Sequence, residues 1–542
     1  MNNVNIMTTL RLLLVGSLLT LIWINESLQA NDLSRRPNVL FIAIDDLKPW
    51  LGCYGNPIVK TPNLDRIAAM GTVFRRNYCQ VAICGASRMS LLTGLRPDTT
   101  GVYNMGGEIF HIDSARKRAP QLTTLPEHFK HHGYICRGFG KVFDSRNTDN
   151  GQDKQSWSNR EGVLWKWDES LWPAPARGGY QNPHTRKLID SALADAKQRG
   201  IEQKANILDF LSSVDGTRPV CESEDVPDEA YAEGNAMATP AVKMIHQHGR
   251  NYREGGQPMF LAVGFYKPHL PFVAPQKYWD LYCEDDFEPA SAQHYPTDGV
   301  SYAETVYVEG RGFHPVPSQG KIPEPLQRHM MHGYAACVSY VDAQVGKLLQ
   351  ALEDESLLGD TIICVWGDHG FHLGDKQLWG KHTNFEQATR SPLIIASPKI
   401  PGGRVDDDTL TEFVDVFPTL CELAAMDPPS KLEGESLVAL MRGEQPTANP
   451  PAVSQYMRDT EEGKVMGWAI RNARYRYVEW RPISNKDLRF TFSNSVVGAE
   501  LYDYQTDPNE AYNLAEDPEY NKIRSEMVKL FDEVLPHLPA RK

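Results

Sequence analysis

Two stretches of this 542-residue chain end in side chains that suit a hard cation. Asp45 and Asp46 follow one continuous apolar run, and Asp368 and His369 follow another. Adjacent carboxylates repel one another unless a cation lies between them, and oxygen-rich clusters favour Ca²⁺ or Mg²⁺. The same acids are also suitable N-caps for helices that follow a strand. The pattern therefore predicts either a metal site or two capped helices.

A cysteine at position 84 begins a short helical pattern that ends at Gly94. A helix N-terminus favours anionic groups, and Arg88 one turn later adds a fixed positive charge. This arrangement indicates a site for a thiolate or an oxyanion. An isolated cysteine is also commonly a small buried hydrophobe, but the adjacent Ser87 and Arg88 argue against that interpretation.

Strands and helices alternate around these residues. Runs that are apolar at every position are typical of strands buried on both faces of a parallel sheet. Between them lie helical patterns such as 334–352, whose apolar residues keep one face over five turns. This alternation predicts an α/β fold with a large doubly wound, mostly parallel sheet, whose ligand site lies past the carboxyl ends of its strands. The expected strands are 38–44, 134–138, 259–265, 361–366 and 392–396.

The chain divides into a large and a small domain. Residues 37–440 are expected to form the catalytic α/β domain, and a Gly/Pro/Asn-containing stretch at 442–451 is a linker. Residues 452–542 are expected to form a smaller C-terminal domain of antiparallel sheet plus a helix at 521–534. The polar segment 145–255 is weakly periodic and predicts an insertion over the sheet edge that carries substrate specificity. The small sheet is expected to contain strands at 468–471, 475–480 and 488–492.

Composition excludes two classes of protein. The 56 Lys and Arg residues against 69 Asp and Glu residues give a net charge of -13, and no Lys/Arg-rich run is present, so a nucleic acid is not an expected partner. The mean hydropathy of -0.43 excludes a multispan membrane protein. The nine cysteines lack C-x-x-C spacing, which excludes a zinc ribbon or a thioredoxin motif.

The N-terminus indicates export. Arg11 precedes an apolar run at 12–24, and we interpret residues 1–30 as a signal peptide that is cleaved after Ala30. The alternative is a membrane anchor, for which this run is short. We therefore expect an exported protein, in a periplasmic, extracellular or lumenal space, with no stable membrane insertion after cleavage.

Several motifs resemble one known family. Cys84-Gly85-Ala86-Ser87-Arg88 resembles the C-x-P/A-S-R signature of type I sulfatases, members of the alkaline phosphatase-like superfamily whose cysteine is oxidised to formylglycine. Further motifs over most of 37–425 resemble the iduronate-type sulfatases, and 500–508 is similar to the sulfatase C-terminal domain. These further motifs include Asp45-Asp46-Leu47-Lys48-Pro49, Leu51-Gly52-Cys53-Tyr54-Gly55, Thr61-Pro62-Asn63-Leu64-Asp65, Arg96-Pro97-Asp98-Thr99-Thr100, Gly140-Lys141-Val142-Phe143, Lys267-Pro268-His269 and Asp368-His369-Gly370.

The resemblance implies a site for one calcium ion. Its ligands would be Asp45, Asp46, Asp368 and His369, with an oxygen from the modified Cys84. Many sulfatases have asparagine in the place of His369, so the alternative is that this histidine orients a ligand rather than binding the metal.

The resemblance also implies a set of cationic residues around the sulfate ester. Arg88, Lys141, His269 and Lys381 would surround the formylglycine hydrate, and His269 or Lys381 would protonate the departing sugar oxygen. One position departs from the family. The iduronate-type motif continues Gly-Lys-Val-Phe-His, whereas this chain has Asp144, which either turns outward or alters the second half-reaction.

The activity implied is that of a calcium-dependent sulfuric ester hydrolase. Its substrate would be a sulfated polysaccharide or oligosaccharide carrying a 2-O-sulfated uronate, and a formylglycine-generating maturation enzyme would first convert Cys84. The alternatives are another sulfatase or a phosphodiesterase of the same fold, or a non-catalytic glycan-binding relative in which Cys84 stays unmodified.

Overall fold

The computed structural model describes residues 36–149, 152–158, 179–201, 203–305, 307–445 and 448–541. The segment interpreted as a signal peptide, 1–30, lies outside these residues. Among the helices of the described ranges, none combines the length and the apolar character that crossing a membrane would require.

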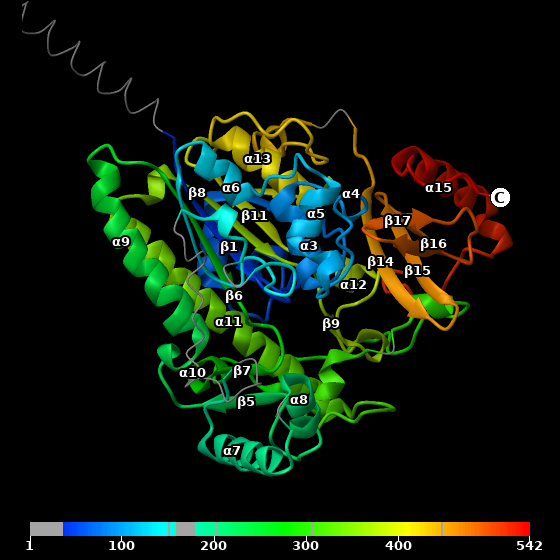
Figure 1. Ribbon diagram of the computed structural model, residues 1–542, viewed down its shortest axis with the longest axis horizontal. Helices are drawn as coiled ribbons and strands as arrows, with labels where there is room; N and C mark the ends of the chain where they lie inside the picture. Colours follow the sequence, from blue (N-terminus) through cyan, green and yellow to red (C-terminus); the bar gives the residue numbers. More distant parts are fainter. Residues whose placement is uncertain are drawn as a thin grey trace, which may run out of the picture. The chain divides into compact units, whose positions relative to one another are not determined.

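A seven-stranded sheet forms the centre of the large domain, in the order β12-β2-β11-β8-β1-β6-β4 (Figure 1). β4, β6, β1 and β8 pair in parallel, and β12 pairs in parallel with β2. Only β11 is reversed, because it pairs antiparallel with both β8 and β2. The prediction of a mostly parallel sheet is therefore confirmed. The strands are β1 (Asn38–Ile44), β2 (Gly71–Phe74), β4 (Ile135–Gly140), β6 (Met259–Phe265), β8 (Thr361–Gly367), β11 (Leu393–Ala396) and β12 (Arg404–Asp406).

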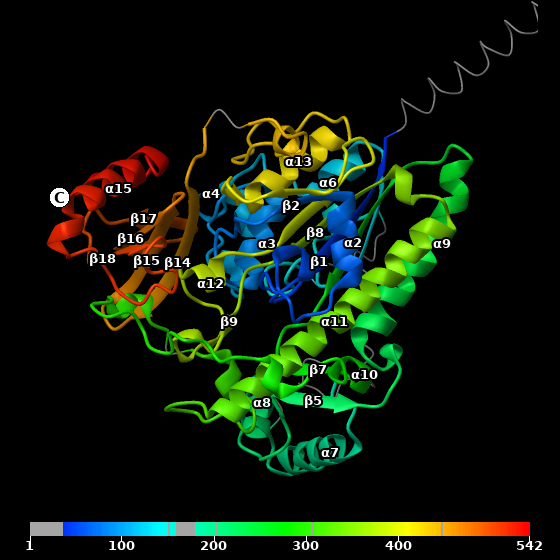
Figure 2. The ribbon, with the colours of Figure 1, turned by 180° about the vertical axis from the view of Figure 1, so that it is seen from behind.

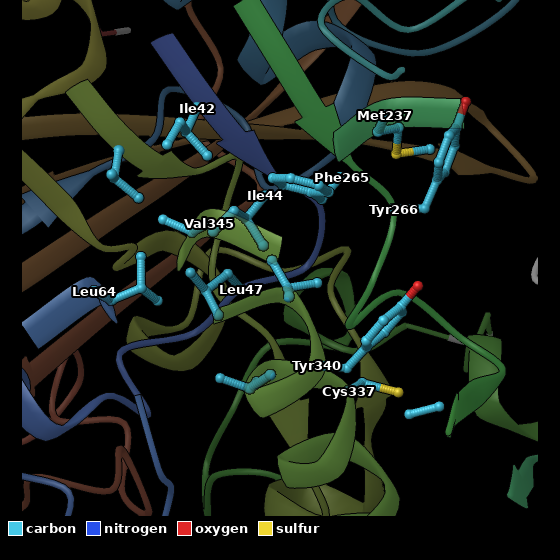
Figure 3. Packing of buried hydrophobic residues seen from close by; sticks show 14 of the residues in the cluster. Ile42, Ile44, Leu47, Leu64, Met237, Phe265, Tyr266, Cys337, Tyr340 and Val345 are labelled. Carbon is cyan, nitrogen blue, oxygen red and sulfur yellow. The ribbon is translucent and has the colours of Figure 1, made fainter. Parts of the chain in front are cut away.

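Helices cover both faces of this sheet, which explains why β1 is apolar at every position. Leu40, Ile42 and Ile44 pack on one face with α2 (Pro62–Met70), α9 (Thr239–Arg253) and α11 (Glu324–Asp354). Figure 2 shows these helices together on one side, and Figure 3 shows part of their packing near the end of β1.

The alternate side chains of β1 belong to a second core. Val39, Phe41 and Ala43 pack with residues of α3 (Cys84–Thr93), α6 (Leu125–His131) and α13 (Val416–Leu423). Double coverage removes solvent from both faces of the strand, so polar alternation is absent from its sequence.

The segment 145–255 contains both peripheral and core elements. α7 (Pro183–Gln198) and α8 (Lys204–Ser212) precede β5 (Cys221–Glu224), which pairs only with the short strand β7 (Phe272–Pro275) in a separate two-stranded sheet. In contrast, α9 is packed in the main core through Ala241, Ile245 and Tyr252, which are buried. The end of this segment, α9, therefore packs on one face of the large sheet, the face that carries Leu40, Ile42 and Ile44, and does not lie over the sheet edge.

The C-terminal region forms a second, antiparallel sheet. Its order is β14-β15-β16-β17, and β18 pairs with the first half of β16. Met527 and Phe531 of α15 pack against one face. The expected strands and the expected helix are present, and β14 and β18 are additional. These elements are β14 (Ala452–Thr460), β15 (Gly463–Arg471), β16 (Tyr475–Lys486), β17 (Arg489–Phe492), β18 (Gly498–Asp503) and α15 (Asn521–Val534).

Close packing where β6 meets β4 leaves no room for a side chain at Gly264. A Cβ at this position would overlap the carbonyl group of Lys141. We expect Gly264→Ala to lower the free energy of unfolding by about 1–3 kcal/mol, because backbone atoms must move to relieve the overlap. Urea-induced unfolding measures this change.

The matched control is Gly359→Ala. No atom lies within 4 Å of a Cβ built at Gly359, so we expect a change within about 0.5 kcal/mol. If the two variants are equally stable, the steric overlap expected for a side chain at position 264 is wrong.

Candidate active site

The carboxyl ends of four parallel strands meet at one edge of the large sheet. The last residue of β1, Ile44, lies opposite Phe265 of β6 and Gly367 of β8, and the end of β4 lies opposite Gly264. The residues that follow these strands therefore leave the sheet side by side. They include Asp45, Asp46, Lys141, Tyr266, Asp368 and His369.

Three carboxylates are completely buried at this edge. The side chains of Asp45, Asp46 and Asp368 have no exposed surface. The backbone N–H of Asp46 donates to Asp368 Oδ1 at 3.0 Å. Asp46 has a φ of 61°, a left-handed conformation in which aspartate is more frequent than most residues. The turn after β1 is thus tied directly to the turn after β8.

Arg88 joins the carboxylates of two strands. Its Nε donates to Asp368 Oδ2 at 2.9 Å, and its Nη2 donates to Asp45 Oδ1 at 3.3 Å. Its Nη1 donates to the carbonyl groups of Lys141 and Val142. The side chain is fully buried and does not line the cavity described below. Arg88 therefore holds the acidic groups in place, one turn into α3 as the helical pattern predicts.

Two buried lysines pair with the acidic groups from the cavity side. Lys141 Nζ lies 2.6 Å from Asp45 Oδ2. Lys381 Nζ lies 2.8 Å from both Asp46 Oδ1 and Glu309 Oε2. Burial alone would lower the pKa of Lys381, but the carboxylate of Asp46 raises it well above its usual value. Both lysines are therefore ammonium ions at neutral pH.

Cys84 is the first residue of α3, and it faces His369. Its Sγ lies 3.3 Å from His369 Nε2. His369 Nδ1 lies 2.8 Å from the carbonyl oxygen of Gly370, so Nδ1 carries the hydrogen and Nε2 presents a lone pair. Burial and the nearby charge of Asp45 raise the pKa of the Cys84 thiol well above its usual value. An unmodified Cys84 is therefore a neutral thiol, which argues against the thiolate alternative.

His269 lies on the same side as Lys381. Its Nδ1 is 2.7 Å from the carbonyl oxygen of Leu270, and its Nε2 is 3.3 Å from Glu309 Oε1. Glu309 thus contacts both residues that the resemblance implies as proton donors. It begins the short 3₁₀ helix Glu309–Gly312 and belongs to no motif, so nothing in its sequence context identifies it.

Asp144 does not turn outward. Its carboxylate accepts hydrogen bonds from Arg146 Nε at 2.8 Å and Arg146 Nη2 at 2.6 Å. The same carboxylate lies 3.5 Å from Lys141 Nζ. Burial would raise the pKa of Asp144, but Lys141 and Arg146 lower it far below its usual range. The aspartate is therefore a neutralised anion beside Lys141, at the wall of the same cavity.

The acidic groups and their neighbours fit a divalent cation. Four carboxylates face the three cations Arg88, Lys141 and Lys381, which leaves one negative charge in excess. Burial, together with neighbouring carboxylates, raises the pKa of Asp46 well above its usual value despite Lys381. Candidate ligand atoms of Asp45, Asp46, Cys84 and His269 lie within 4.8 Å of one another, as do those of Cys84, Asp368 and His369. Oxygen-rich donor sets of this kind suit Ca²⁺. The four carboxylates are Asp45, Asp46, Asp368 and Glu309.

A cavity of about 1060 Å³ opens over these residues. Cys84, Lys141, His269 and Lys381 form part of its wall. Its other residues come from several separate parts of the chain, so the segment 145–255 forms only one side. They include Asn104 and Met105; Asp144, Ser145, Arg146, Asp209, Ser212 and Arg218; Tyr266; Ser301, Tyr302, Glu304, Thr305, Tyr307, Val308, Glu309, Gly312 and Phe313; His382; and Tyr456, Met457, Arg458, Asp459 and Thr460.

All nine cysteines of the chain are unpaired thiols. Cys79, Cys136, Cys337, Cys364 and Cys421 are buried with Cys84. No two of the nine cysteines therefore form a disulfide with each other.

Comparison with known proteins supplies the family. A family model described as sulfatase matches residues 37–426, and one described as N-sulphoglucosamine sulphohydrolase, C-terminal, matches residues 374–535. Iduronate 2-sulfatase of Mus musculus is 31% identical over an alignment that covers 94% of this chain and 96% of that protein. Delta 4,5-hexuronate-2-O-sulfatase of Bacteroides thetaiotaomicron is 25% identical, with 92% and 89% covered.

The fold also occurs in a solved structure of different activity. Phosphonate monoester hydrolase of Agrobacterium radiobacter superimposes with a TM-score of 0.65 at 22% identity, covering 93% of this chain and 96% of that one. This similarity concerns the fold alone. The family match over most of the chain, together with a relative more than 30% identical over nearly its full length, establishes that the chain belongs to the sulfatase family.

Proposed function

We propose that this chain is a calcium-dependent sulfuric ester hydrolase that uses a formylglycine made from Cys84. The observation that carries the proposal is the position of Cys84, which lies between the buried acidic cluster and the cavity wall formed by Lys141, His269 and Lys381. A nucleophile at this position has cations on the cavity side and candidate metal ligands behind it.

The chain's own residues would bind and orient the sulfate group. A sulfate ester is electron-rich around sulfur, so cations must offset the charge on its nonbridging oxygens. Lys141 and Lys381 are charged, buried and at the cavity wall. Asp45 and Asp46 fix their ammonium groups, which keeps the positive charge in place before substrate arrives.

Two groups that the family implies would complete the site. Asp45, Asp46, Asp368 and His369 would hold calcium together with the modified residue 84. The hydrated aldehyde would supply two hydroxyl groups on one carbon, and calcium would favour ionisation of one of them.

Proton transfer would fall to histidine and lysine. His269 Nε2 and Lys381 Nζ both contact Glu309. Lys381 is charged and is suited to protonate the departing sugar oxygen. Burial and the charge of Lys381 lower the pKa of His269 well below its usual value, and its Nδ1 faces a carbonyl oxygen, so His269 would serve as the donor only after Nε2 takes up a proton.

The proposed substrate is a sulfated sugar, a 2-O-sulfated uronate within a polysaccharide fragment. Two relatives named for iduronate and hexuronate 2-O-sulfatase activity support this choice, and the cavity has room for a sugar residue. The proposal also includes export through residues 1–30 and modification by a formylglycine-generating enzyme. Compared hydrolysis of aryl sulfate and aryl phosphate esters separates it from a phosphodiesterase of the same fold.

The first prediction concerns residue 84 itself. We expect mass spectrometry of the Cys84 peptide from the native host to detect the aldehyde, and we expect Cys84→Ser to reduce turnover of an aryl sulfate to background. Serine supplies one hydroxyl group, so the sulfated enzyme would have no second hydroxyl with which to expel sulfate. An intact thiol, or parental turnover by Cys84→Ser, would favour the glycan-binding alternative.

The second prediction concerns calcium. Asp368→Asn removes one carboxylate from the cluster, and we expect calcium bound per protein molecule, measured by elemental analysis, to fall at least tenfold, with activity falling in parallel. Asp342→Asn is the matched control, because Asp342 is equally buried but caps the start of α2 through Asn63 and Leu64. Calcium retained by Asp368→Asn, or lost equally from both variants, would contradict the proposed site.

The third prediction concerns the departure at position 144. We expect Asp144→His to lower kcat at least tenfold, because Lys141 and Arg146 would lose the carboxylate between them. Removing the second cation as well, in Asp144→His with Arg146→Ser, should recover part of that loss. A single Asp144→His variant that turns over faster than the parent would instead identify Asp144 as a defect.

A further inference from the structure

An arginine of the C-terminal sheet lines the active-site cavity without an acidic partner. Arg458 lies on β14 and contributes to the cavity wall together with Cys84 and Lys381. Among the described residues, no carboxylate forms an ion pair with it. Another arginine of the cavity wall, Arg146, is neutralised by Asp144.

The guanidinium group of Arg458 is held in a fixed orientation. Its Nε donates to the carbonyl oxygen of Tyr302 at 3.1 Å, and its Nη2 donates to that of His382 at 2.6 Å. It lies over the ring of Tyr456, 4.3 Å from the ring centroid. Neutral groups therefore position the guanidinium group of Arg458, and it keeps N–H donors for a further partner.

Burial makes this arrangement costly for the protein alone. It lowers the pKa of Arg458, and the main opposing influence comes from Tyr456 rather than from an acid. Arg458 is only partly exposed and nevertheless stays charged, and a charge with reduced access to water and no counter-ion is unfavourable. An anion that enters the cavity would supply the missing counter-ion.

The position of Arg458 relative to the reaction centre is fixed through one short loop. The residue that accepts its hydrogen bond, His382, directly follows Lys381, and Lys381 contacts Asp46. His382 Nδ1 is also 2.8 Å from the hydroxyl group of Tyr456. A substrate held at Cys84 by its sulfate group would therefore face Arg458 with another part of the same molecule.

One further arginine of the cavity forms no ion pair with a carboxylate in the part of the chain that the structure describes. Arg218, from the segment 145–255, donates to the hydroxyl group of Ser212 and lies 4.6 Å from the ring centroid of Phe313. It is not bonded to the loop that carries Lys381. Arg218 therefore serves as the matched comparison for Arg458.

We propose that Arg458 binds a second anionic group of the substrate, a sugar carboxylate or a further sulfate, and so selects polyanionic sugars. This inference rests on the proposed sulfatase activity on a sulfated uronate. It adds the residue that binds an anionic group of the substrate other than the sulfate that is removed. A guanidinium fork suits carboxylate and sulfate oxygens, because two parallel N–H donors match two acceptors.

The test compares substrates across variants. Parent, Arg458→Met, Arg458→Lys and Arg218→Met are assayed on a 2-O-sulfated uronate disaccharide, its carboxyl-reduced form, and a disaccharide with an additional sulfate on the neighbouring sugar. We expect Arg458→Met to reduce the preference for the anionic over the carboxyl-reduced substrate, as a ratio of kcat/KM, by about 10- to 100-fold. Arg458→Lys should lose part of that preference, because it keeps the charge but not the fork. Thermal unfolding checks that each variant folds.

Several outcomes decide between the alternatives. A preference that depends on the additional sulfate rather than the carboxylate identifies the sulfate as the anion, and the assignment to Arg458 stands. An unchanged ratio in Arg458→Met, or a ratio that falls only in Arg218→Met, overturns it. If Arg458→Met does not fold, an unchanged ratio in Arg458→Lys overturns it.

Failure of the proposed function is recognised separately. If the parent hydrolyses 4-nitrophenyl sulfate but none of the sulfated uronates, the proposed sugar is wrong. The inhibition of 4-nitrophenyl sulfate hydrolysis by sulfated oligosaccharides is then compared between parent and Arg458→Met. A weaker inhibition of the variant supports anion binding by Arg458, and equal inhibition constants overturn it.

Discussion

The structure depends on burying several carboxylates at the end of a sheet. Asp45, Asp46 and Asp368 have no contact with solvent, and an isolated buried carboxylate is strongly unfavourable. Arg88 offsets Asp45 and Asp368 through direct hydrogen bonds, Lys141 also pairs with Asp45, and Lys381 offsets Asp46. These contacts of Arg88 tie helix α3 to the ends of both β1 and β8.

The same constraint explains the chemistry expected of Cys84. A cysteine at a helix N-terminus often has a lowered pKa, but here burial and the negative charge of Asp45 outweigh that effect. The unmodified side chain is thus a weak nucleophile, although it lies at the cavity wall beside the lysines and the candidate metal ligands. Conversion to another nucleophile is consistent with that position.

The C-terminal sheet contributes residues of β14 to the wall of the active-site cavity. The backbone of β14 bonds to the segment that leads to Cys84, where Gln455 N–H donates to the carbonyl oxygen of Gln80 at 2.7 Å. A buried ion pair of 2.8 Å between Arg476 and Glu386 anchors the loop that follows Lys381. The segment before Cys84 and the segment after Lys381 therefore both contact the C-terminal sheet.

The sequence by itself determined five of the seven strands of the main sheet, the helix that begins at Cys84, the last helix and the residues that follow the strands, but not β2 or β12. These features depend on local apolar patterns and on which residues follow a strand. Only the tertiary structure decided that β11 is reversed, that α9 belongs to the core, and that Glu309 and Arg458 face the cavity. The direction of a strand and the partners of a loop residue depend on contacts between distant parts of the chain, which no local pattern encodes. The charge balance of the site likewise became visible only when residues from five separate strand ends and loops were brought together.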